Sequence, residues 1–94
     1  MTKYRKITPE ETIVKMGENE WAFRDSKTYW TIESIARLMC TSKYQAKKIV
    51  HYLKDHGNLQ LDCEMRECLG SYSPYRHWRI TSTGWESFNK LTNQ

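Results

Sequence analysis

The spacing of the apolar residues changes at Gly57, and this change limits the folds that the chain can adopt. Before Gly57, apolar residues recur every three or four positions, as they do on one face of an α-helix. After Gly57, apolar and polar residues alternate from Leu59 to Met65, as they do in a strand with one buried face. The sequence therefore predicts an α+β fold, with helices first and a strand pair after them.

The residues before Gly57 contain the start signals of three helices. Thr8 can cap the first helix and Pro9 suits its first position. This helix and an extension from Trp21 to Trp30 make up residues 1–30, and the extension either continues the helix or forms a small hairpin. Thr31 is expected to cap a second helix, with Ile35 on its apolar face.

The third predicted helix is regular and basic. Ser42-Lys43-Tyr44-Gln45 has the form of a capping box, and glycine at position 57 is suited to follow the last turn. From Arg37 to Lys54 there are five basic residues and no acidic residue, a concentration of charge that a polyanion-binding surface requires. The inward stripe of this helix contains Ala46, Ile49, Val50 and Leu53. Residues 31–57 are therefore predicted to form a helix-turn-helix.

The rest of the chain predicts a β-hairpin over residues 58–81 and a short helix over residues 82–94. Glu67–Pro74 is expected to be the hairpin loop, and Tyr75–Thr81 the second strand. Thr83 begins a capping box for the last helix. The faces of the second strand are predicted as Trp78 and Ile80 on one side, and His77 and Arg79 on the other. The order of elements predicts a single winged helix-turn-helix domain over residues 1–94.

The exposed stripe of the third helix is the predicted DNA-reading surface. The second helix of such a pair lies in the major groove, where its outer side chains meet phosphates and base edges. Lysines there would neutralise phosphates, whereas Gln45 can pair bidentately with adenine and Tyr44 can touch a thymine methyl group. Arg66 and Arg76 would bracket the tip of the wing. The candidate DNA-binding residues are Arg37, Ser42, Lys43, Tyr44, Gln45, Lys47, Lys48, His51, Arg66 and Arg76.

These residues resemble winged-helix transcription regulators. The run from Tyr44 to Lys47, with Leu53 four residues before the glycine, is similar to the small fimbrial-switch regulators of enteric bacteria, the Pap and Fae type. Trp30 followed by Ile35-Ala36 resembles the CaiF/GrlA type of activator. The resemblance implies a bacterial or phage regulator that binds double-stranded DNA, in company with a second transcription regulator. The acidic wing and the segment up to Trp30 depart from the fimbrial group, which leaves the target site and the partner open.

An enzyme is not expected, and neither is a metal or another cofactor. Cys63 and Cys68 are separated by four residues, no Cys-x2-Cys pair occurs, and no catalytic motif is present. Cys63 is predicted to be a buried thiol on the apolar side of its strand. The tryptophans are predicted to lie in the core, because a domain of this size needs their area: Trp21, Trp30, Trp78 and Trp85.

Two questions about partners stay open from the sequence. A protein-interaction module, such as a phage or plasmid-encoded modulator of a host factor, would use the acidic N-terminal third and the aromatic residues Tyr29, Tyr72 and Tyr75. A homodimer would form through the first or last helix, although the same residues could lie in the core: Ile13, Val14, Phe88 and Leu91. The three cysteines and the charged N-terminus predict a cytoplasmic protein without a membrane partner.

Overall fold

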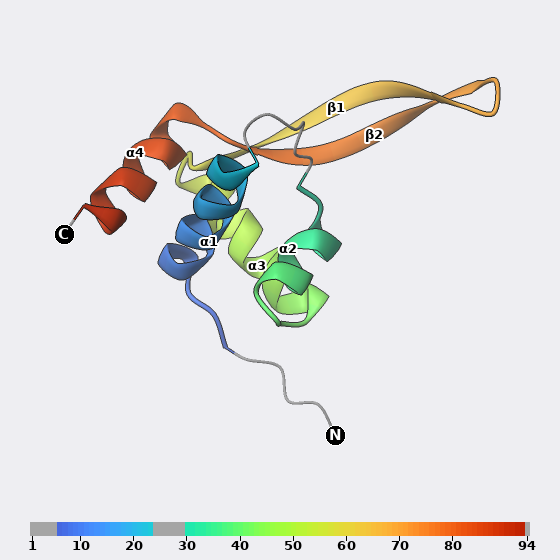
Figure 1. Ribbon diagram of the computed structural model, residues 1–94. Coiled ribbons are helices and arrows are strands. Elements are labelled where there is room, and N and C mark those ends of the chain that lie inside the picture. The colour runs from blue at the N-terminus through green and yellow to red at the C-terminus, as the bar shows by residue number, and fades with distance from the viewer. Residues whose placement is uncertain (1–5, 24–29, 94) are drawn as a thin grey trace.

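Helices gather at one end of the molecule, and a long β-hairpin projects away from them (Figure 1). The computed structural model describes residues 6–23 and 30–93. Its elements are α1 (Pro9–Ala22), α2 (Ile32–Leu38), α3 (Lys43–Asp55), β1 (Leu59–Cys68), β2 (Ser71–Ile80) and α4 (Ser82–Thr92). The predicted α+β class and the predicted order of elements are confirmed. No helix of the described residues has the length and apolar character that crossing a membrane requires.

Side-chain caps begin the helices. The Thr8 hydroxyl accepts a hydrogen bond from the Glu11 amide at 3.1 Å, as predicted. Thr31 and Ser34 cap α2 reciprocally, with bonds of 3.1 and 2.8 Å. The cap of α4 is Thr81, which accepts from the Gly84 amide at 3.0 Å, so the predicted cap at Thr83 is wrong. The chain is still extended at Thr81, which places the first helical turn two residues earlier than the sequence pattern indicated.

The core lies between the helices and the base of the hairpin. Its buried apolar residues are Ile13, Met16, Trp30, Ile35, Ala36, Met39, Ala46, Val50, Leu53, Leu59, Trp78 and Ile80. Trp85 packs against this core, so three of the four tryptophans serve it as predicted. Trp21 does not, because it lies in the last turn of α1 and remains 63% exposed.

The hairpin is longer than predicted, and the expected loop Glu67–Pro74 is wrong. The strands pair from Leu59 opposite Ile80 to Cys68 opposite Ser71. Only Leu69 and Gly70 separate them, both with positive φ (53° and 80°), as two-residue hairpin turns require. Polar residues and a proline are typical of a loop, but here they belong to paired strands whose exposed outer part does not require an apolar sequence.

The apolar alternation of β1 continues beyond the core. Leu61 is 44% and Met65 is 63% exposed, and Cys63 is also exposed, so the predicted burial of its thiol is wrong. Leu61 faces buried Trp78, and Cys63 and Met65 lie successively farther out, towards the part of the hairpin that extends past the helices (Figure 1). His77 differs in the opposite direction, because this histidine is buried although it belongs to the predicted polar face. The base of the hairpin is therefore covered on the face of Leu59, Trp78 and Ile80, whereas on the opposite face His77 is buried and Arg79 is exposed.

Asn58 joins three elements at the base of the hairpin. Its amide donates to the Leu53 carbonyl near the end of α3 at 2.8 Å, and its carbonyl accepts from the Thr81 amide at 3.1 Å. Its side-chain oxygen accepts from the Ser87 hydroxyl of α4 at 2.9 Å. A β-carbon at Gly84 would collide with the Asn58 carbonyl, which explains glycine there. One residue thus fixes the end of α3, the start of β1 and the position of α4.

Candidate nucleic-acid interface

A tight turn sets the angle between α2 and α3. Cys40 adopts a left-handed conformation with φ of 53°. The Thr41 amide donates to the Ala36 carbonyl at 2.9 Å, and the Cys40 amide donates to the Arg37 carbonyl at 3.3 Å. These bonds end α2 and direct the chain into Ser42, the N-cap of α3. The turn therefore holds α3 against α2 with one face outward.

The outer face of α3 is hollowed along its length. A shallow depression of about 520 Å³ is lined by Tyr44, Lys47, Lys48, His51, Tyr52 and Asp55. Tyr44 is 71% exposed, and the Lys48 ammonium lies 5.5 Å from the centre of its ring, a cation–π contact that holds this lysine beside the tyrosine. Four predicted residues are thus brought together, and Asp55 places a negative charge at the C-terminal end of the face.

The lysines of α3 differ in their neighbours. Lys43 forms a 3.2 Å ion pair with Glu33 of α2, and both side chains are largely exposed. Exposed pairs contribute little to stability, but this one lowers the positive charge at the start of α3. Within the described part of the chain, Lys47 and Lys48 have no ion-pair partner. The positive charge of the face is therefore centred on Lys47 and Lys48.

Ser42 and Gln45 lie at the start of α3. The Ser42 hydroxyl accepts from the Gln45 amide at 3.2 Å, so it serves as the helix cap. The Gln45 side chain is half-buried and lines a second depression of about 350 Å³, to which Lys6 and Ile7 also contribute. Gln45 is therefore on the flank of the face, next to the segment that precedes α1.

The hairpin meets the same side of the molecule through His51. The His51 ring contacts the edge of Trp78 in β2, with 5.8 Å between ring centres and an interplanar angle of 83°. Arg76 is exposed and lies two residues farther out on the same face of β2, about 7 Å along the strand. Arg76 lies opposite Cys63 in the middle of the hairpin rather than beside its tip. The backbone of Arg66 pairs with Ser73, and the Arg66 side chain is outside the described residues.

Sequence reasoning did not find three residues of this surface. Tyr52 is 45% exposed, lines the depression and stacks on His56 at 4.0 Å. Its position one turn beyond Lys48 on the helix was a usable signal. Lys6 and Glu33 come from other segments, so only the tertiary structure brings them to α3. Arg37, which was predicted, is exposed on α2.

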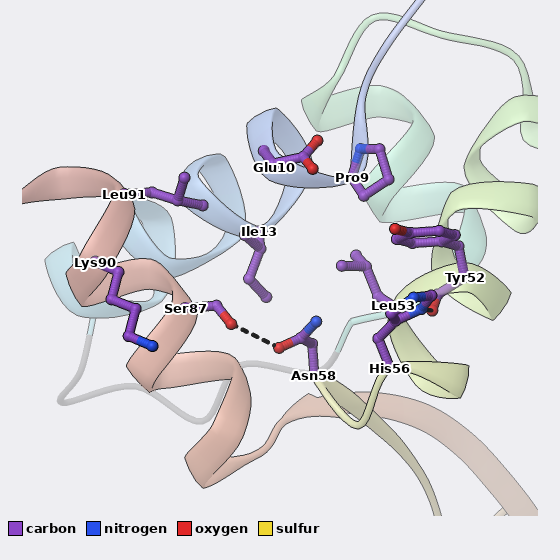
Figure 2. Close-up of a pocket in the computed structure, with 10 residues that line it drawn as sticks. All are labelled: Pro9, Glu10, Ile13, Tyr52, Leu53, His56, Asn58, Ser87, Lys90 and Leu91. Carbon is purple, nitrogen blue, oxygen red and sulfur yellow. Dashed lines mark hydrogen bonds between the residues drawn. The ribbon is translucent and has the colours of Figure 1, made fainter.

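A third hollow lies elsewhere, between α1, α3 and α4. It has a volume of about 280 Å³, and Figure 2 shows Ile13 and Leu53 pointing into it, with the Asn58–Ser87 hydrogen bond along one side. His56 is the only imidazole in its lining. Across the described residues, no group of histidine, cysteine and acidic side chains is arranged to hold a metal ion. This hollow has an apolar floor, and it shares only Tyr52 with the lining of the depression on the outer face of α3.

Comparison with known proteins provides no relative. No protein-family model, no curated protein and no solved structure matches the chain. The surface of α3 and the arrangement of elements around it are therefore the features from which a function can be inferred.

Proposed function

We propose that the chain is a winged-helix protein that binds duplex DNA with the outer face of α3 and regulates transcription. In this assignment α2 and α3 form the helix-turn-helix, and β1 and β2 form the wing. The observation that carries the proposal is the face itself, on which Lys47 and Lys48 lie beside exposed Tyr44 and no acid occurs before Asp55. Lysines on the exposed face of a helix can reach the phosphates that border the major groove.

The hairpin is placed where it could contact the same duplex as α3. His51 connects α3 to the face of β2 on which Arg76 is exposed, so both elements can contact one ligand. Glu67 occupies the same face farther out, which limits the electrostatic attraction between the tip and DNA. The proposal therefore assigns most of the affinity to α3 and a single backbone contact of the hairpin to Arg76.

The test is a titration of fluorescent duplexes, of random and genomic sequence, at several salt concentrations. Binding is expected at micromolar or lower concentration, and it should weaken steeply with salt. Lys47→Ala combined with Lys48→Ala should lower the slope of log affinity against log salt by about 0.9 for each lysine. The matched control is Lys15→Ala with Lys90→Ala, which removes the same charge from exposed positions of α1 and α4.

The control double variant should keep the wild-type slope. Absence of binding at low salt would exclude the proposal. A slope that falls equally in both double variants would show that net charge, rather than α3, attracts DNA.

A protein-interaction module is the second candidate, and exposed aromatic residues favour it. Trp21 is 63%, Phe23 is 58% and Tyr72 is 69% exposed, and such side chains are enriched in protein interfaces. Tyr75 is half-buried, and Tyr29 lies outside the described residues. A partner that binds through these residues would show weak salt dependence and would be unaffected by the α3 lysines. The salt titration therefore separates the two candidates.

A further inference from the structure

The two edges of the hairpin differ in their capacity to accept another strand. At the base of β2, the Trp78 amide donates to the Trp30 carbonyl at 2.6 Å, so this edge is occupied there. Farther out, β2 contains Pro74, which has no amide hydrogen to donate. β1 contains no proline, and among the described residues its only strand partner is β2. The outer edge of β1 is therefore the edge open to pairing.

The bond between Trp78 and Trp30 also shows which backbone groups of β1 point outward. Facing residues of an antiparallel pair alternate between those that bond each other and those whose N–H and C=O groups point away. Trp78 donates away from β1, so Trp78 and the facing Leu61 belong to the second kind. By alternation, the outward positions of β1 are Leu61, Cys63, Met65 and Glu67.

Pro74 provides an independent check of this alternation. Proline is tolerated in a strand pair only where its missing amide would point away from the partner strand. Pro74 faces Met65, which the alternation places among the outward positions. The same stretch of β1 exposes apolar side chains, because Leu61 is 44% and Met65 is 63% exposed. A second strand beside β1 would satisfy its open backbone groups and cover part of this apolar surface.

We propose that two copies of the chain associate through their β1 edges, antiparallel and with Met65 on the two-fold axis. The result is a four-stranded sheet in which each Met65 backbone exchanges two hydrogen bonds with the partner's Met65. Glu64 then lies opposite the partner's Arg66, a pairing of opposite charges that occurs twice. Three or more strands are more stable than an isolated pair, which explains a hairpin that extends past its own core.

Charge selects this register from its neighbours. Centring the contact on Cys63 would place Asp62 opposite the partner's Glu64. Centring it on position 64 would place two glutamates opposite each other. Like charges in facing positions destabilise strand pairs, so only the register centred on Met65 combines outward backbone groups with opposite charges. This dimer does not require contacts between the first or last helices of the two copies. Ile13 is buried within the chain, and Phe88 packs on Gly17.

The test is the oligomeric state, measured by sedimentation velocity over a range of concentrations without DNA. The wild-type chain is expected to be a dimer. Met65→Pro removes an amide that points away from β2, so the hairpin should be retained, as it is with Pro74 in the facing position, while the two axial hydrogen bonds are lost. The dissociation constant should rise by roughly tenfold or more. Met65→Arg should have the same effect, because two positive charges would meet on the axis.

The matched control is Tyr72→Arg. Tyr72 is exposed and on the same face of the hairpin, but it lies in β2, away from the β1 edge. This variant should remain a dimer, and circular dichroism should show a folded chain in every variant. If Met65→Pro fails to fold, Met65→Arg decides. A monomeric wild type, a dimer that survives Met65→Arg, or dissociation by Tyr72→Arg would each overturn the proposal, whatever the result with DNA.

Discussion

Gly17 of α1 and Phe88 of α4 are packed so closely that a β-carbon at position 17 would overlap the phenyl ring. This contact brings two helices together that are far apart in the sequence, and it explains a glycine in the middle of α1. Glycine costs helix stability at such a position, so close packing provides the compensation. The contact also uses Phe88 inside the chain rather than in an interface between copies.

Gly17→Ala is expected to destabilise the chain although alanine favours helices. The new methyl group must displace the Phe88 ring, and such overpacking typically costs about 1–3 kcal/mol. Urea denaturation measures the change. Phe88→Leu lacks the ring, so adding Gly17→Ala to that variant should cost much less. An equal cost in both backgrounds would mean that the Phe88 ring does not limit position 17.

Glu20 predicts a change of stability with pH. Burial raises the pKa of this carboxyl, and its Oε2 atom is buried without a hydrogen bond from the described residues. Since the folded chain holds the proton more tightly than the unfolded chain, the wild type is penalised at neutral pH. This penalty is relieved as the pH falls through the raised pKa towards the ordinary value of 4.5.

Glu20→Gln should therefore be more stable than the wild type at pH 7, and this advantage should shrink towards pH 4.5. Urea denaturation at a series of pH values measures the difference. The control is Glu18→Gln at an exposed position of the same helix, which should give no comparable advantage. An advantage of Glu20→Gln that does not change with pH would contradict the assignment to this carboxyl.

Ser42 separates the structural role of the α3 N-cap from its proposed role in DNA binding. Ser42→Ala should lower the stability by about 1 kcal/mol, because the Gln45 amide loses its acceptor. Ser42→Asp keeps an acceptor and should preserve stability, yet it should weaken duplex binding by repelling phosphates. Thermal unfolding and the duplex titration measure the two effects.

The control for Ser42→Asp is Thr81→Asp, which makes the same kind of exchange at the cap of α4, away from both depressions on α3. It should leave duplex affinity close to that of the wild type. Equal weakening by both aspartates would indicate a general charge effect instead of a contact near Ser42.

Gln45→Ala tests sequence readout within the proposed function. Loss of a bidentate contact with adenine should reduce discrimination at one base pair by about 1–3 kcal/mol, whereas Lys47→Ala should weaken all duplexes alike. Selection of preferred sites from a random duplex library compares the two variants. An unchanged preference in Gln45→Ala would show that this residue does not read the sequence. The half-buried position of Gln45 on the flank of α3 already limits its access to a base pair.

The fold was predictable where local chemistry determines it. Threonine and serine caps start α1, α2 and α3 at the predicted residues, and Gly57 follows α3 with φ of 78°. The hairpin loop was mispredicted because its sequence, with a glycine, a proline and two serines, indicates a loop whether or not the strands continue to pair. Leu69 in a left-handed conformation gave no local signal of a turn.

The candidate site was predictable in part for a similar reason. Helical periodicity places Tyr44, Lys48 and His51 on one face, and the depression on α3 contains them all. Periodicity does not show which residues of other segments approach that face, so Lys6 and Glu33 were missed. The predicted burial of the apolar face of β1 was wrong beyond Leu59. Alternation identifies which face of a strand is apolar, but it does not show how far along the strand the other elements cover that face.

The position of Asn58 implies an order of folding. The side-chain bond between Asn58 and Ser87 spans 29 residues. α2 and α3 can pack as soon as they form, because their turn is short. The bonds of Asn58 to Thr81 and Ser87 become available only when the hairpin has closed and returned the chain to its starting point. Bringing residues 58 and 87 together lowers the conformational entropy of the chain before the contacts between them can stabilise it. We therefore expect α4 to dock last, and the domain to become complete only as fast as the hairpin forms.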